Sequence, residues 1–243
     1  LQYFIDVSDW RATYDGIALF LLLALPPLCL LLRRRPTAVL QAPPGGHATT
    51  DRPLGLAPNG LHGVLCCAGL ACCVAMAVPQ AHIVAHATDL GHAARRGAEM
   101  LALLLATGIV SRLAFGWISD RIGGLKTLLL GGSLQALTLF MFMFAESLTA
   151  LYLMSALFGL SQGGIVPSYA VIVRGYFVPG QVGWRISVVL STTLLGMALG
   201  AWLAGLLYDW TGSYRLAFII AVAVNILHMI IAWFLLRRAR QSL

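Results

Sequence analysis

The sequence predicts an all-α integral membrane protein with seven transmembrane helices, six of which form two inverted three-helix repeats. Composition, the position of the basic residues and an internal repeat support this fold class. Of the 243 residues, 59% are apolar and 10% are charged, and the mean hydropathy of +0.85 is far outside the soluble globular range. Because the basic residues lie between apolar runs, the net charge of +7 indicates membrane topology, and nucleic acid is not an expected partner.

The first predicted span covers residues 16–32. Acidic residues precede it and Arg33, Arg34 and Arg35 follow it, so we do not expect a cleavable signal peptide. We interpret it as a span that ends at the cytoplasmic face. Because the chain starts at Leu1 and enters this span almost at once, we expect a fragment of a longer protein.

Residues 36–60 are rich in proline and glycine and have no hydrophobic period, which predicts a polar loop between two larger units. Six further apolar runs approach or exceed the roughly 20 residues that a bilayer requires. They cover residues 61–84, 97–119, 125–145, 148–173, 187–208 and 216–236.

The basic residues predict the orientation of these spans. With the first span ending inside, eleven Arg and Lys residues lie in cytoplasmic segments and four in outer segments. We therefore expect a cytoplasmic C-terminus. The expected location is the cytoplasmic (inner) membrane of a bacterium.

An internal repeat relates the first three spans after the loop to the last three. Residues 116–126 recur at an offset of 89, and Val78-Pro79 recurs as Val166-Pro167 at an offset of 88. Three spans separate the copies, so the second repeat is inverted, as in secondary transporters. The predicted repeats are residues 61–145 and 146–243. The first recurrence pairs Gly116, Asp120, Gly123 and Lys126 with Gly205, Asp209, Gly212 and Arg215.

Two further patterns concern helix packing. Gly159 with Gly163, and Gly196 with Gly200, have the four-residue spacing that lets membrane helices approach closely. Proline breaks the backbone hydrogen-bond ladder, so we expect kinks at residues 79 and 167.

A cation inside an apolar run is the main candidate for function. Seven residues separate Arg112 from Asp120, which places Arg112 about 10 Å inside the membrane. A cation there costs about 2.5 to 3.5 kcal/mol, so we expect it to face a water-filled cavity or a buried partner. The alternative is that Arg112 extends along its own helix to the headgroups. Gly108 and Gly116, one turn away on either side, clear space and favour the first interpretation.

The planar guanidinium donates two parallel hydrogen bonds to a carboxylate, which favours a small organic anion as substrate. His82, Gln162, Tyr169 and Thr192 could line the same cavity, although polar residues in spans also serve in helix packing. His82 and His86 have the spacing of metal ligands but no third ligand nearby, so we predict neither a metal nor a cofactor. We interpret the five cysteines as small apolar residues.

The segment GWISDRIGGLK resembles the loop between the eighth and ninth spans of the major facilitator superfamily. The resemblance implies that Gly116, Asp120, Arg121, Gly123 and Lys126 control the conformational change of a transporter. It also implies that residues 1–35 correspond to the sixth span of the preceding half, that residues 36–60 are the cytoplasmic central loop, and that the rest is one half-bundle. The missing partner is then the N-terminal half-bundle.

The HATDLG run, residues 86–91, and an arginine four residues before the motif glycine resemble the monocarboxylate and oxalate:formate exchanger branch. This resemblance implies that Arg112 binds the substrate carboxylate. Gly108 stands where the proton symporters have an acid, and residues 187–208 contain no lysine, which the oxalate exchanger has there. The species coupled to transport could therefore be either a proton or an exchanged anion.

The leading function is secondary active transport of a small organic anion, a mono- or dicarboxylate, across the lipid bilayer by alternating access. The alternative is a transporter-like sensor or assembly partner that transports nothing. We do not expect an enzyme, because the sequence has no intramembrane acid pair, no nucleophile with a base and no phosphate-binding loop.

The charge distribution yields a topology prediction. In a full-length protein without its native cysteines, Asp89→Cys should react with a membrane-impermeant thiol reagent added outside, and Gly45→Cys should not. Labelling of position 45 without labelling of position 89 would show that the predicted orientation is wrong.

Overall fold

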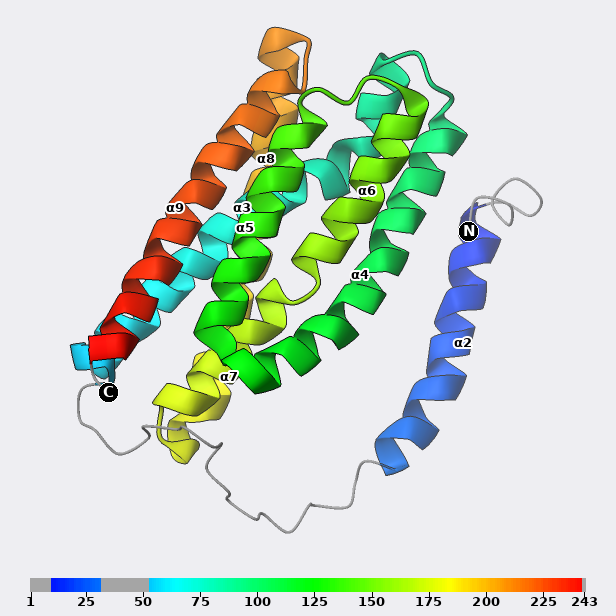
Figure 1. The fold of residues 1–243 in the computed structure, drawn as a ribbon. Helices are drawn as coiled ribbons and strands as arrows, with labels where there is room; N and C mark the ends of the chain where they lie inside the picture. The colour runs from blue at the N-terminus through cyan, green and yellow to red at the C-terminus, as the bar shows by residue number, and fades with distance from the viewer. Residues whose placement is uncertain (1–9, 32–52, 242–243) are drawn as a thin grey trace. The chain divides into compact units, whose positions relative to one another are not determined.

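The structure, a computed structural model, describes residues 10–31 and 53–241 (Figure 1). Within these ranges all regular structure is helical and there is no strand, as predicted. The chain divides into two compact units, Leu1–Ala42 and Pro43–Leu243. The division falls inside the predicted loop of residues 36–60. Most of that loop lies outside the described residues, as do residues 1–9.

In the first unit the structure describes one helix, α2 (Trp10–Leu31). Its apolar segment, Tyr14–Leu28, is shorter than the roughly 20 residues of a membrane span. Pro26 and Pro27 lie inside the helix. The seventh transmembrane helix therefore stays a prediction.

The second unit confirms the six spans predicted after the loop. Its helices are long and apolar enough to cross a membrane, with α6 and α7 counted as one span. Most of them extend beyond the predicted ranges because their ends are polar. The elements are η1 (Pro53–Gly55), α3 (Pro58–Asp89), α4 (Ala94–Ile122), α5 (Gly124–Phe142), α6 (Leu148–Gln162), α7 (Ile165–Tyr176), α8 (Pro179–Thr211) and α9 (Arg215–Gln241).

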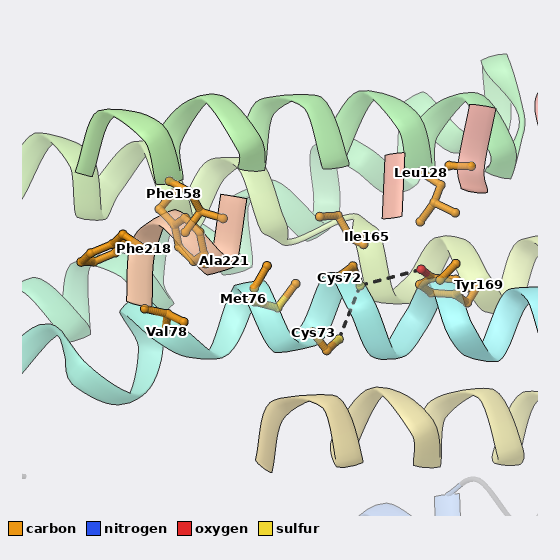
Figure 2. Packing of buried hydrophobic residues seen from close by; sticks show 14 of the residues in the cluster. Cys72, Cys73, Met76, Val78, Leu128, Phe158, Ile165, Tyr169, Phe218 and Ala221 are labelled. Atoms are coloured by element: carbon orange, nitrogen blue, oxygen red, sulfur yellow. Dashed lines mark hydrogen bonds between the residues drawn. The ribbon is translucent and has the colours of Figure 1, made fainter. Parts of the chain in front are cut away.

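Helix α3 is the centre of this unit, because it packs against α4, α8 and α9. Of its most apolar stretch 72% is buried, against 22% in both α4 and α8. The reason lies in its sequence, which is apolar and small on all sides and so has no face suited to water. Figure 2 shows part of the core around it, with Cys72, Met76 and Val78 of α3, Ile165 and Tyr169 of α7, and Phe218 and Ala221 of α9.

Small residues bring the helices close together, as the glycine spacing predicts. A Cβ atom built on Gly200 of α8 would lie 2.2 Å from the Val74 carbonyl oxygen of α3. A Cβ atom on Gly159 of α6 would lie 2.2 Å from the Leu104 carbonyl oxygen of α4. Only glycine permits backbones to approach this closely.

The span predicted over residues 148–173 is broken just before Pro167, where a kink is expected. Helix α6 ends at Gln162 and α7 begins at Ile165. Pro167 has no N–H to bond the carbonyl of Gly163, and adjacent glycines favour a bend at this point. By contrast, α3 continues through Pro79 as one helix.

The turn glycines of the two predicted repeats both have a positive φ, although their ψ angles of 158° and 17° differ. Gly123, which follows α4, has φ +83°, and Gly212, which follows α8, has φ +65°. Side chains rarely adopt this region, so glycine is required to end each helix here. These residues occupy matching positions at the offset of 89.

The close approach of α8 to α3 yields a stability prediction. Gly200→Ala should force the two backbones apart and destabilise the full-length protein by about 1 to 3 kcal/mol. Gly63→Ala is the matched control, because nothing lies within 4 Å of a Cβ atom at this helical position. A melting temperature measured in detergent should fall only for Gly200→Ala. Equal melting temperatures for the two variants would contradict the packing described here.

Candidate functional site

Arg112 lies on a face of α4 that the rest of the second unit does not cover. Its side chain is exposed, as are Ile109 and Leu113, which are 62% and 76% exposed. It forms no hydrogen bond, ion pair or ring contact with any residue in the described part of the chain; both ion pairs found there involve Glu99. Something other than the described side chains must therefore compensate its charge within the membrane.

The neighbouring face of α4, which bears Gly108 and Ser111, fastens it to the break between α6 and α7. The Ser111 hydroxyl donates to the Leu160 carbonyl oxygen at 2.6 Å. A Cβ atom built on Gly163 would lie 2.6 Å from the Gly108 carbonyl oxygen. Arg112 thus directly follows Ser111, which is in tight contact with the broken span.

Two amide side chains meet beside this break. Gln162, the last residue of α6, is buried and accepts a hydrogen bond from the amide nitrogen of Gln80 in α3. The amide nitrogen of Gln162 would lie 3.9 Å from a Cβ atom built on Gly108, one turn before Arg112. This nitrogen has no hydrogen-bond partner among the described residues. Sequence reasoning missed Gln80, although a single amide directly after Pro79 in an apolar run was a signal.

The arrangement combines a free guanidinium, amide donors and an interrupted helix. Interrupted membrane helices release backbone groups from the hydrogen-bond ladder and often form substrate sites near the midplane. Gln80 from α3 and Gln162 from α6 meet at one such interruption, and Gly108, one turn before Arg112 on α4, packs against it. Chemically, these donors suit an oxygen-rich anion.

His82, predicted as a cavity residue, instead joins three elements. Its Nε2 lies 2.8 Å from the Ala201 carbonyl oxygen of α8, so Nε2 carries the proton and donates. Its Nδ1 lies 3.2 Å from the Tyr214 hydroxyl and accepts from it. Burial, with Asp89 nearby, raises the pKa of the Tyr214 phenol, which keeps it a neutral donor. Neither nitrogen of His82 remains for a substrate or a metal.

Tyr169 and Thr192 also take part in packing. Tyr169 is fully buried, and its hydroxyl lies 3.3 Å from His228 Nδ1 and 3.7 Å from Cys72 Sγ (Figure 2 draws the second contact). The Thr192 hydroxyl donates to the Val189 carbonyl oxygen within α8 at 2.7 Å. The structure brings neither residue to the break beside Arg112.

The glycine turn, residues 116–126, lies at the end of α4 and the start of α5. Gly116 has open space around it, with nothing within 4 Å of a built Cβ atom. The Arg121 guanidinium stacks over the Trp117 ring at 3.8 Å. Asp120 and Lys126 are exposed and form no ion pair within the described ranges. The carboxylate of Asp120 is thus available to a partner.

Six membrane-length helical spans, one of them broken, define the second unit as part of an all-helical membrane protein. Comparison with known protein families agrees with a membrane protein of this kind and identifies its family. The family model described as Major Facilitator Superfamily matches residues 64–243, and the chain belongs to this superfamily. The match confirms the family predicted from the glycine turn.

Among curated proteins, the chain is 30% identical over 137 residues to monocarboxylate transporter 13 of Rattus norvegicus and, equally, of Bos taurus. These matches cover 56% of this chain and 32% of each relative. A probable anion transporter 5 of Arabidopsis thaliana is 32% identical over 103 residues, which is 42% of this chain and 24% of that protein. The chain thus matches about a third of the length of the monocarboxylate transporters, and it resembles that branch as predicted.

These relatives bear on two other expectations. All three are named as transporters and none as an enzyme. They come from two mammals and a plant, so they give no support to a bacterial inner membrane. The cytoplasmic position of the C-terminus remains a prediction.

The free carboxylate of Asp120 yields a prediction about conformation. A carboxylate is stabilised by the free amides and positive dipole end of a helix N-terminus, and the superfamily resemblance suggests a helix of the N-terminal half as the partner. Asp120→Asn in the full-length protein should therefore shift the balance between outward-open and inward-open states. Labelling of single cysteines on each side of the membrane measures this balance. Substrate binding serves as the control, because the substitution should leave the substrate contacts intact. Unchanged labelling on both sides would argue against a gating role.

Proposed function

We propose that the full-length protein is a secondary active transporter of a small organic anion, a mono- or dicarboxylate, and that Arg112 binds the carboxylate. The observation that carries this proposal is the unpaired, uncovered Arg112 beside the broken span. The similarity to monocarboxylate and anion transporters supports it.

The energetics favour an anion as the compensating group. An uncompensated cation at this depth costs about 2.5 to 3.5 kcal/mol, and a carboxylate offsets the charge while accepting two hydrogen bonds from the guanidinium. Gln162, held by Gln80, supplies a neutral donor one turn away and would orient the second end of the anion. His82 and Tyr169 stay outside this site because their polar atoms bind other helices.

Transport would proceed by alternating access, with the N-terminal half-bundle forming the other wall of the cavity. The contacts of α8 with α3 and of α6 with α4 are equivalent under exchange of the two predicted repeats, which supports the inverted-repeat arrangement. Gly116, Asp120, Arg121, Gly123 and Lys126 would control the inner gate. The coupling species is a proton or an exchanged anion.

Substitution of Arg112 tests the proposal. Arg112→Lys keeps the charge but loses the bidentate geometry, and a hydrogen bond to a charged group is worth about 1.5 to 3 kcal/mol. Carboxylate binding should therefore weaken about ten- to a hundredfold. Arg112→Ala should abolish uptake while membrane insertion is preserved, because the change removes a costly charge. The measurements are binding and uptake of radiolabelled lactate and oxalate by the full-length protein in vesicles.

Arg95→Ala is the matched control, because Arg95 is also an exposed arginine of α4 but is paired with Glu99 at 3.3 Å. It should transport like the parent. If Arg112→Ala also transports like the parent, Arg112 extends to the headgroups or is structural. If neither the parent nor any variant transports or binds these anions, the sensor or assembly role takes the place of transport.

A further inference from the structure

A second candidate site lies at the end of the bundle where α3 finishes and α9 begins. A cavity of about 330 Å³ opens between the last turn of α3, the α5–α6 turn and the start of α9. None of the residues that bind substrate in the proposed function line it. A volume of this size is within the range of small-molecule sites. The topology predicted from the basic residues places it on the outer side of the membrane.

The floor of this outer cavity is aromatic. Phe142 of α5 and Phe218 of α9 lie with their ring centroids 5.6 Å apart and their planes at 8° to each other. Both are almost fully buried in the bundle, so their position is fixed by packing. Because they line the cavity, these two rings give its floor an apolar character, although little of their surface is exposed.

The rim of the outer cavity carries opposite charges that do not pair. Glu146 and Arg215 both line it, yet among the described residues both ion pairs belong to Glu99. The turn that holds Glu146 is fixed, since His92 Nε2 donates to the Glu146 carbonyl oxygen at 3.3 Å. Arg215 is the first residue of α9, where the helix dipole adds to the attraction for an anion. The cavity lining therefore offers one carboxylate to a cation and one guanidinium to an anion.

A ring nitrogen in the wall also lacks a partner. The Nε2 atom of His86 is buried and makes no hydrogen bond to any described residue. The ring is held in place by an edge-on contact with Phe218, at 5.5 Å between centroids. A buried polar atom without a partner is unfavourable, so a ligand that bonds it gains stability.

We propose that the outer cavity binds a small zwitterion with an apolar side chain, with the size and charge pattern of an apolar amino acid. Its ammonium group pairs with Glu146, its carboxylate with Arg215, and its side chain covers Phe142 and Phe218. His86 Nε2 bonds one of the two charged groups. A simple anion would leave Glu146 uncompensated and a simple cation would leave Arg215 uncompensated, so both charges are required for tight binding.

The test uses L-phenylalanine as probe and full-length protein in detergent, with binding measured by calorimetry. 3-Phenylpropionate lacks the ammonium group and phenethylamine lacks the carboxylate, so each should bind at least about tenfold more weakly than L-phenylalanine. Glu146→Gln and Arg215→Gln should each weaken L-phenylalanine binding by a similar factor. Both residues are exposed, so the substitutions should leave the fold intact.

Two controls separate this site from the proposed transport site. Arg95→Gln removes another arginine expected on the outer side, which does not line the cavity, and should leave L-phenylalanine binding unchanged. Arg112→Ala should leave it unchanged as well. Binding that survives Glu146→Gln and Arg215→Gln but is lost in Arg112→Ala would overturn the proposal, since the amino acid would then occupy the other site. Equal affinity for 3-phenylpropionate measured in the Arg112→Ala protein, where the proposed transport site is removed, or no binding of L-phenylalanine at millimolar concentration, would also overturn it.

Discussion

The hydrocarbon interior of a membrane offers no hydrogen bonds, so every polar group placed there needs a partner within the protein. The bundle meets much of this constraint with helices and with side chains that bond neighbouring backbones, although Gln135 Oε1, Asn225 Oδ1 and His228 Nε2 find no partner among the described residues. Gln135 of α5 donates to the Cys72 carbonyl oxygen of α3 at 3.2 Å, and Asn225 of α9 donates to the Gly132 carbonyl oxygen of α5 at 2.9 Å. Arg112 is the charged exception inside the apolar part of α4, and for that reason it carries the functional proposal.

The packing of the bundle determines where this exception lies. Glycines let α6 approach α4 closely, and the same contact holds the end of α6 beside Gly108 and Ser111. The break after Gln162 then lies next to the turn of α4 that bears Arg112. The crossing of α4 and α6 thus places the turn that bears Arg112 beside Gln162 and the interruption of the helix.

Composition predicted the class and the six spans of the second unit, since burial in lipid requires long apolar runs. The helix bounds were less well predicted, because α8 begins at Pro179 and its first turns, with Gln181 and Arg185, are helical and polar. Partners across the bundle could not be predicted at all. Gln80 and Gln162 are 82 residues apart, and His82 and Tyr214 are 132 apart, and no periodicity in the sequence relates them. A polar residue in an apolar span indicates that its side chain has a partner. The sequence does not show whether this partner is another helix or a ligand.

The central claim is that Arg112 faces a water-filled cavity and a carboxylate rather than lipid. The direct test is Arg112→Cys in a full-length protein without its native cysteines, treated with a charged, membrane-impermeant thiol reagent. Such reagents need an ionised thiol, which forms in water and not in hydrocarbon. Rapid labelling is expected at position 112, and no labelling is expected of Leu137→Cys, an exposed position in the apolar run of α5. Labelling at position 112 that is no faster than at position 137 would contradict the claim.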